Sequence, residues 1–100
     1  MQPQGTETIE AEVRNLSAEQ LTPTVTTDTG LLQGAAQPAT VPPNSTTNVR
    51  FAVPTVEPWK IVIAPGEWIS KADYDRFGRP GCKLFFEEGA DGSFSYGCQG

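Results

Sequence analysis

The last twenty residues, Gly81 to Gly100, constrain the possible fold of this chain most strongly. Two runs of β-type side chains flank Gly89-Ala90-Asp91-Gly92, a cluster that supplies the positive φ angles of a tight hairpin. If Glu88 pairs with Gly92 across a three-residue loop, strand alternation fixes every other pair. The register then gives three further pairs on one face: Phe86 with Phe94, Leu84 with Tyr96, and Cys82 with Cys98. The sequence therefore predicts a closing β-hairpin.

The chain has two cysteines, Cys82 and Cys98, and this register places them opposite each other. Opposed residues on an antiparallel ladder lie about 4.5 to 5.5 Å apart, close to the reach of a disulfide. We therefore predict a Cys82–Cys98 disulfide, which would contribute roughly 3 kcal/mol by closing its loop. The alternative is two reduced, buried cysteines. A disulfide indicates an oxidising compartment, so we expect an extracellular or periplasmic (cell envelope) location.

Length and composition predict one domain with little tendency to bind nucleic acid or membranes. The chain has 100 residues and a net charge of -5, and its seven basic residues form no cationic stripe. It contains no apolar run of the roughly 18 residues that span a membrane, and its polar start is typical of a segment of a longer protein. We expect a disordered tail over residues 1–6 and a single β-sandwich domain over residues 7–100.

Alternating apolar and polar residues predict short strands around Ile9–Val13, Val49–Val53 and Trp59–Ile63, whereas Glu67–Phe77 favours one or two helical turns. Turn signals recur at intervals near ten residues, so the sequence predicts an all-β fold: an antiparallel, Ig-like β-sandwich of six to seven strands with a disulfide-stapled C-terminal hairpin. The expected core consists of Ile9, Val13, Val25, Val49, Phe51, Val53, Trp59, Ile61, Ile63, Leu84, Phe86, Phe94 and Tyr96.

One phrase of the sequence resembles a known group of domains. Val41-Pro42-Pro43-Asn44-Ser45 leads into a strand with Val49, Phe51 and Val53 on one face, and Pro54 ends it. This arrangement resembles bacterial extracellular Ig-like or cupredoxin-like β-sandwich domains over roughly residues 9 to 63. The resemblance implies a sandwich fold without a copper site, because the chain lacks the histidines that blue copper requires.

The residue types present argue against catalysis. The absence of histidine excludes Ser/His and Cys/His nucleophilic sites. A pair of carboxylates could still hydrolyse glycosides, and the candidates are Glu67, Asp73, Asp75, Glu87, Glu88 and Asp91. Acidic loop residues of an acidic protein are usually only solvated charge, so we expect no enzyme.

The spacing of Asp73 and Asp75 is compatible with a calcium loop, but helix capping and an Asp–Arg contact are the favoured interpretation. We therefore expect neither a metal nor another cofactor at these residues.

The aromatic residues Trp68, Tyr74 and Phe77 in the 65–80 connection are the candidate ligand-binding residues. The alternative, which the sequence favours, is a lid that buries these rings over the core. We expect a non-catalytic extracytoplasmic module that serves as a spacer or as a protein-interaction or adhesion domain. An accessory carbohydrate-binding module that uses these aromatic side chains is the alternative, so the expected partner is a protein or a polysaccharide.

Overall fold

The computed structural model of the chain describes residues 5–77 and 83–99, which form strands and one short helix. The elements are β1 (Thr6–Asn15), β2 (Thr24–Thr27), β3 (Gly30–Leu32), β4 (Ala36–Gln37), β5 (Ser45–Pro54), β6 (Trp59–Ala64), β7 (Glu67–Ser70), α1 (Lys71–Phe77), β8 (Lys83–Glu88) and β9 (Phe94–Gln99). The all-β prediction is confirmed. Of the stretch Glu67–Phe77 that was predicted to form helical turns, Lys71–Phe77 is helical, whereas Glu67–Ser70 is strand β7. The nine strands of the described residues exceed the predicted six to seven because β3, β4 and β7 are too short to show a clear alternation.

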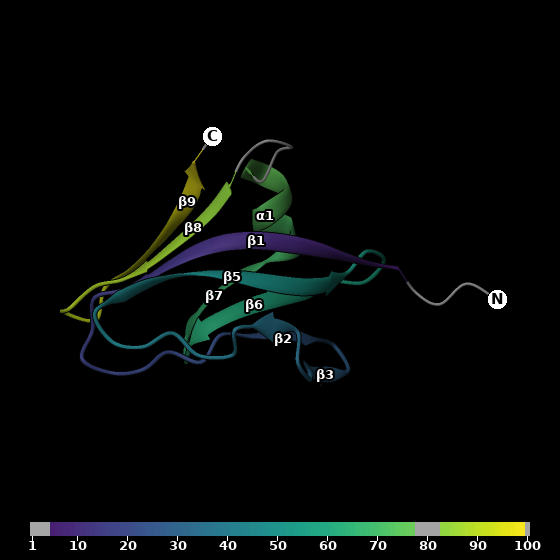
Figure 1. Cartoon of the computed structure of the whole chain (residues 1–100). Coiled ribbons are helices and arrows are strands. Elements are labelled where there is room, and N and C mark those ends of the chain that lie inside the picture. Colours follow the sequence, from purple (N-terminus) through teal and green to yellow (C-terminus); the bar gives the residue numbers. More distant parts are fainter. Residues whose placement is uncertain (1–4, 78–82, 100) are drawn as a thin grey trace.

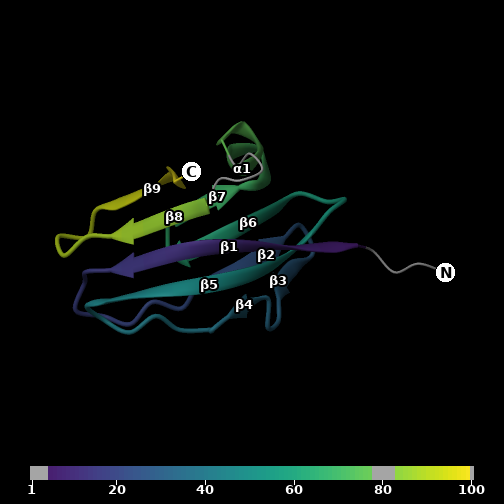
Figure 2. The same cartoon turned by 45° about the horizontal axis from the view of Figure 1, so that its top comes forward.

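The strands form two sheets that lie face to face (Figures 1 and 2). One sheet has the order β4-β5-β1-β8-β9, and the other has the order β3-β2-β6-β7. The prediction of a wholly antiparallel fold is wrong at one place, because β1 and β8 pair in parallel. Parallel neighbours need a crossover connection. Here the chain forms strands of the other sheet after β1 and returns to the first sheet as β8.

The core lies between the sheets because alternate residues of each long strand face inward. In β1, Ile9, Ala11 and Val13 are buried, while Glu10 and Arg14 are exposed. The antiparallel partner β5 repeats the pattern with three buried residues, Val49, Phe51 and Val53. The period of two therefore correctly identified which face of these strands is covered.

Most of the expected core is confirmed. Of the thirteen residues predicted, Phe94 is only partly buried and Tyr96 is 43% exposed, because both lie on the edge strand β9. Phe86 links this edge to the centre, since its ring stacks on Phe94 at 6.1 Å and meets Phe51 edge-on at 6.4 Å. Six residues of the buried hydrophobic core were not predicted: Ala11, Leu21, Ala35, Ala36, Val41 and Ile69.

The closing hairpin forms, but the predicted register is wrong by two residues. Glu88 pairs with Phe94 rather than Gly92, and Leu84 rather than Cys82 lies opposite Cys98. The turn is longer than expected and is closed by a hydrogen bond of 2.7 Å from the Gly89 amide to the Ser93 carbonyl. Because a shift of two preserves the face of every side chain, alternation could not detect the error. Cys82 lies outside the described residues, and so does the predicted Cys82–Cys98 disulfide.

A buried asparagine holds the chain where it leaves β1. The Asn15 side-chain amide donates to the carbonyl groups of Glu19, Val41 and Pro42 at 2.7, 3.2 and 3.1 Å. Its Oδ1 accepts from the backbone amide and the hydroxyl of Ser17, at 3.0 and 2.6 Å. A fully buried amide thus fixes the connection after β1 against the segment that precedes β5.

Candidate functional site

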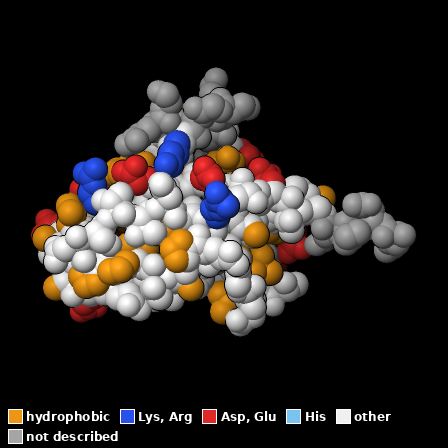
Figure 3. Space-filling view, in the orientation of Figure 1, with side chains coloured by type: hydrophobic (Ala, Val, Ile, Leu, Met, Phe, Trp, Pro, Cys, Tyr) orange, Lys and Arg blue, Asp and Glu red, His pale blue; other side chains and the backbone are white. Residues whose placement is uncertain are grey.

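The outer face of the five-stranded sheet carries charges that neutralise one another. Arg50 pairs with Glu10 at 3.2 Å, and Arg14 approaches Glu87 at 3.8 Å. Lys83 donates to the side chain of Asn48 at 2.8 Å. Basic and acidic side chains accordingly lie side by side in Figure 3, so this face presents no extended region of one charge among the described residues.

The outer face of the other sheet is different, because it carries an aromatic ring among hydroxyl groups. Strand alternation and register bring six side chains together there, and we call them the Trp68 face: Thr24, Thr26, Lys60, Val62, Trp68 and Ser70. Val62 lies between Thr24 and Trp68, and Lys60 lies between Thr26 and Ser70. The result is an open sheet surface rather than a loop.

Trp68 is 42% exposed although it is the largest side chain of this face. Its neighbour Ile69 is fully buried, so the period of two in β7 directs the indole outward. The ammonium group of Lys60 lies 4.2 Å from the centre of the indole ring, which is a cation–π contact. This contact restricts the side chain while leaving part of the ring accessible.

A small pocket, the indole pocket, adjoins the Trp68 face at the end near α1. Its volume is about 230 Å³, and its polar lining includes Thr26, Thr27, Lys60, Ser70 and Lys71. Trp59 also lines it; this residue is 3% exposed, and its Nε1 has no hydrogen-bond acceptor among the described residues.

The two aromatic candidates whose side chains the structure describes, Trp68 and Tyr74, differ in their surroundings. Tyr74 is half-buried and its ring lies 5.8 Å from that of Trp59, so it covers the core as the alternative interpretation expects. Burial, with smaller contributions from Glu7 and Asp75, raises the pKa of Tyr74. The side chain of Phe77 lies outside what the structure describes. Trp68, by contrast, lies on a strand that the sequence interpretation treated as a connection.

The aspartates of α1 stabilise the helix. Asp73 Oδ2 accepts from the backbone amide of Ser70 at 3.1 Å, and the Ser70 hydroxyl accepts from the amide of Asp73 at 3.2 Å. The hydrogen bonds that the backbone amide and the hydroxyl of Ser70 donate to Asp73 Oδ2 lower the pKa of Asp73. Asp75 binds Lys71 at 2.9 Å, one helical turn away. The predicted capping role of Asp73 is confirmed.

Two of the six carboxylates considered from the sequence meet between the sheets. Glu88 is at the end of β8 and only 8% exposed, and Glu67 begins β7 on the facing sheet. Burial first, and then the hydrogen bond and the charge of Glu67, raise the pKa of Glu88 to about 7. Sequence reasoning missed this pair because the two residues lie on different sheets. The only local signal was that each glutamate occupies a strand position whose side chain alternation directs toward the core.

Within the described residues, no group of three or more histidine, cysteine, aspartate or glutamate side chains could hold a metal ion, and no helix is long and apolar enough to cross a membrane. Comparisons of the chain with protein-family models, with curated proteins and with solved structures each found no match.

Proposed function

We propose that this domain is a non-catalytic, extracytoplasmic binding module of a larger secreted or envelope protein, and that its Trp68 face binds a polysaccharide. The observation that carries the proposal is the exposed indole of Trp68 on an open sheet face among threonine and serine hydroxyls. A spacer or protein-interaction role is the alternative if no sugar binds.

The chemistry of the Trp68 face suits a sugar. The C–H faces of a sugar ring can stack on an indole, while its hydroxyl groups need donors and acceptors at fixed positions nearby. Thr26, Lys60 and Ser70 supply such groups on the same face, and the indole pocket beyond them adds Thr27 and Lys71. Because these residues lie on paired strands, little conformational entropy would be lost on binding.

A non-catalytic role is supported by the arrangement of the carboxylates. Glycoside hydrolysis uses two carboxyl groups at least about 5 Å apart with the sugar between them. Glu67 and Glu88 instead interact with each other, which helps to raise the pKa of Glu88, and do not flank a sugar from two sides. The chain also contains no histidine to serve as a general base.

The extracytoplasmic location rests on the proposed Cys82–Cys98 disulfide, and the two-sheet arrangement supports the resemblance to Ig-like or cupredoxin-like sandwiches. No free cysteine occurs in the described part of the chain. We expect intact mass after alkylation to show no modified thiol until the protein is reduced. Two modified thiols in unreduced protein from its native compartment would refute both the disulfide and the location.

The binding proposal is tested by titrating ¹⁵N-labelled protein with soluble β-glucan, xylan and dextran. We expect one of them to shift the resonances of the Trp68 face, and Trp68→Ala to weaken that binding at least about tenfold. Tyr96→Ala is the matched control, since Tyr96 is a similarly exposed aromatic residue (43% against 42%) on the other sheet. The control should bind like the wild type.

Two results would contradict the proposal. If none of the three polysaccharides shifts the Trp68 face, the domain is better described as a spacer or protein-interaction module. If Tyr96→Ala weakens binding as much as Trp68→Ala, the sugar does not bind at the Trp68 face.

A further inference from the structure

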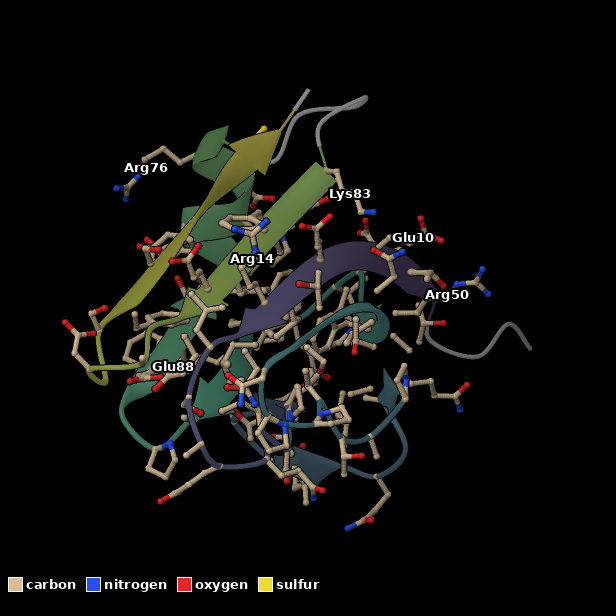
Figure 4. All side chains as sticks on the ribbon, turned by 60° about the vertical axis from the view of Figure 1, so that its left-hand side comes forward. Glu10, Arg14, Arg50, Arg76, Lys83 and Glu88 are labelled. Carbon is tan, nitrogen blue, oxygen red and sulfur yellow. The ribbon has the colours of Figure 1, made fainter. Side chains whose placement is uncertain are left out.

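A second pocket, the acidic pocket, lies at the opposite end of the four-stranded sheet from the indole pocket. It has a volume of about 680 Å³, within the range of roughly 300 to 1,000 Å³ that is usual for small-ligand sites. The connection after β1, the turn between β6 and β7, and the closing hairpin surround it. Its lining includes Glu19, Leu21, Val62, Pro65 and Glu88. Figure 4 shows Glu88 at the hairpin end of β8.

The acidic pocket contains negative charge without a compensating cation. Its lining residues include Glu19 and Glu88, and none of them is a lysine or an arginine. The nearest basic residue along the paired strands is Arg14, which lies opposite Glu87 and binds it on the outer face of the sheet. Alternation therefore separates the neutralised Glu87 from the inward-facing Glu88.

The buried ends of the two carboxylates lack hydrogen-bond donors. Oε1 of Glu88 and Oε1 of Glu67 are both shielded from solvent, and neither has a donor among the described residues. Ionised carboxylates only accept hydrogen bonds, so these two groups can bond to each other only when one of them holds a proton. Glu88 is more than nine-tenths buried and lines the pocket. A buried carboxylate is stabilised by a positively charged hydrogen-bond donor, and the pocket supplies none to Glu88.

We propose that the acidic pocket binds an organic cation with an aliphatic stem, of the kind that a lysine side chain of a partner protein presents, with the ammonium group at Glu88. The stem would lie against Leu21, Val62 and Pro65, which line the same pocket. A basic side chain has this division into an apolar stem and a charged end. The site is separate from the Trp68 face and does not depend on polysaccharide binding.

Binding of a cation should release the shared proton. The groups that face Glu88 are Glu67 from β7 and Glu19 from the connection after β1, while the neighbouring Asn15 of β1 is uncharged and already hydrogen-bonded. The ammonium group would replace the proton as the donor to the Glu88 carboxylate, which lines the pocket. Since Glu88 titrates near pH 7, affinity should rise about tenfold from pH 6 to pH 8.

The test uses Nα-acetyl-lysine methylamide as the probe and Nα-acetyl-norleucine methylamide as its uncharged analogue. Titration of ¹⁵N-labelled protein at pH 8 should shift resonances of Leu21, Val62 and Ala90 with the lysine probe only, at millimolar concentrations. Glu88→Gln should weaken the binding at least tenfold. Glu87→Gln is the matched control, because it removes the same charge from the opposite face of the same strand.

A second variant tests whether binding needs the open pocket as well as the charge of Glu88. Ala90→Trp changes an exposed lining residue and should block the pocket while leaving both carboxylates in place. Several results would overturn the proposal. The two probes could bind equally, Glu88→Gln or Ala90→Trp could leave binding of the lysine probe unchanged, or no resonance could shift at pH 8. Retained binding of the lysine probe by Trp68→Ala would show that this site is independent of the Trp68 face.

Discussion

Replacing Glu88 by glutamine should make this protein more stable at neutral and alkaline pH. In the wild type above pH 7, burial forces two carboxylates against each other without a proton between them. A glutamine at position 88 would donate its amide N–H to Glu67 at every pH. The substitution therefore replaces a titrating hydrogen bond by a permanent one.

The magnitude follows from the change in pKa. The pKa of Glu88 rises from 4.5 to about 7 in the folded protein, so the folded state binds the proton more tightly than the unfolded state does. At about 1.4 kcal/mol for each pKa unit, the free energy of unfolding should be about 2 to 3 kcal/mol greater at pH 5 than at pH 8. This contribution is fully present below pH 4.5 and is lost as the pH rises through 7. For a domain of this size, the difference corresponds to roughly 10 °C or more in melting temperature.

Urea denaturation at pH 5, 6, 7 and 8, followed by tryptophan fluorescence, measures the effect directly. The chain contains no histidine, and hydrogen bonds from Ser70 and Ser93 lower the pKa values of Asp73 and Asp91, so those groups titrate below this window. The wild type should lose stability from pH 5 to pH 8, whereas Glu88→Gln should be nearly flat and about 2 kcal/mol more stable at pH 8. Glu87→Gln should keep the wild-type slope.

Two results would refute this reasoning. A wild-type free energy of unfolding that is constant between pH 5 and pH 8 would mean that the two carboxylates do not share a proton. A Glu87→Gln variant that flattens the profile as much as Glu88→Gln would show that the slope reflects overall charge rather than the buried pair.

Three further substitutions test other parts of the structure by the same denaturation measurement. Asn15→Ala should cost about 3 kcal/mol because it removes the hydrogen bonds by which a fully buried amide joins the connection after β1 to the segment before β5, and a loss below 1 kcal/mol would contradict that role. Gly92→Ala should cost about 1 kcal/mol because φ is 86° at Gly92, a conformation that strains an alanine backbone. An added Cβ meets no other atom within 4 Å, so no steric clash contributes. An unchanged stability would count against the turn geometry. Ser70→Ala should cost about 1 kcal/mol by removing the helix cap, which an equally stable variant would disprove.

The sequence alone determined the local structure of this protein. Alternation of apolar and polar residues in β1 and β5 identified both strands and the face that each one buries, because that period is a property of the extended backbone. The glycines around Ala90 located the closing hairpin, and the residues before Gly78 indicated a short helix in whose capping Asp73 takes part. Each of these features depends on neighbours within a few positions of the chain.

Only the tertiary structure decided the features that depend on distant pairs. A hairpin shifted by two residues has the same faces, so the sequence pattern could not show that Leu84 rather than Cys82 lies opposite Cys98. The parallel pairing of β1 with β8 depends on how the chain crosses between the sheets. The outward indole of Trp68 and the meeting of Glu67 with Glu88 follow from which faces the two sheets turn toward each other, and packing of the whole chain sets that choice.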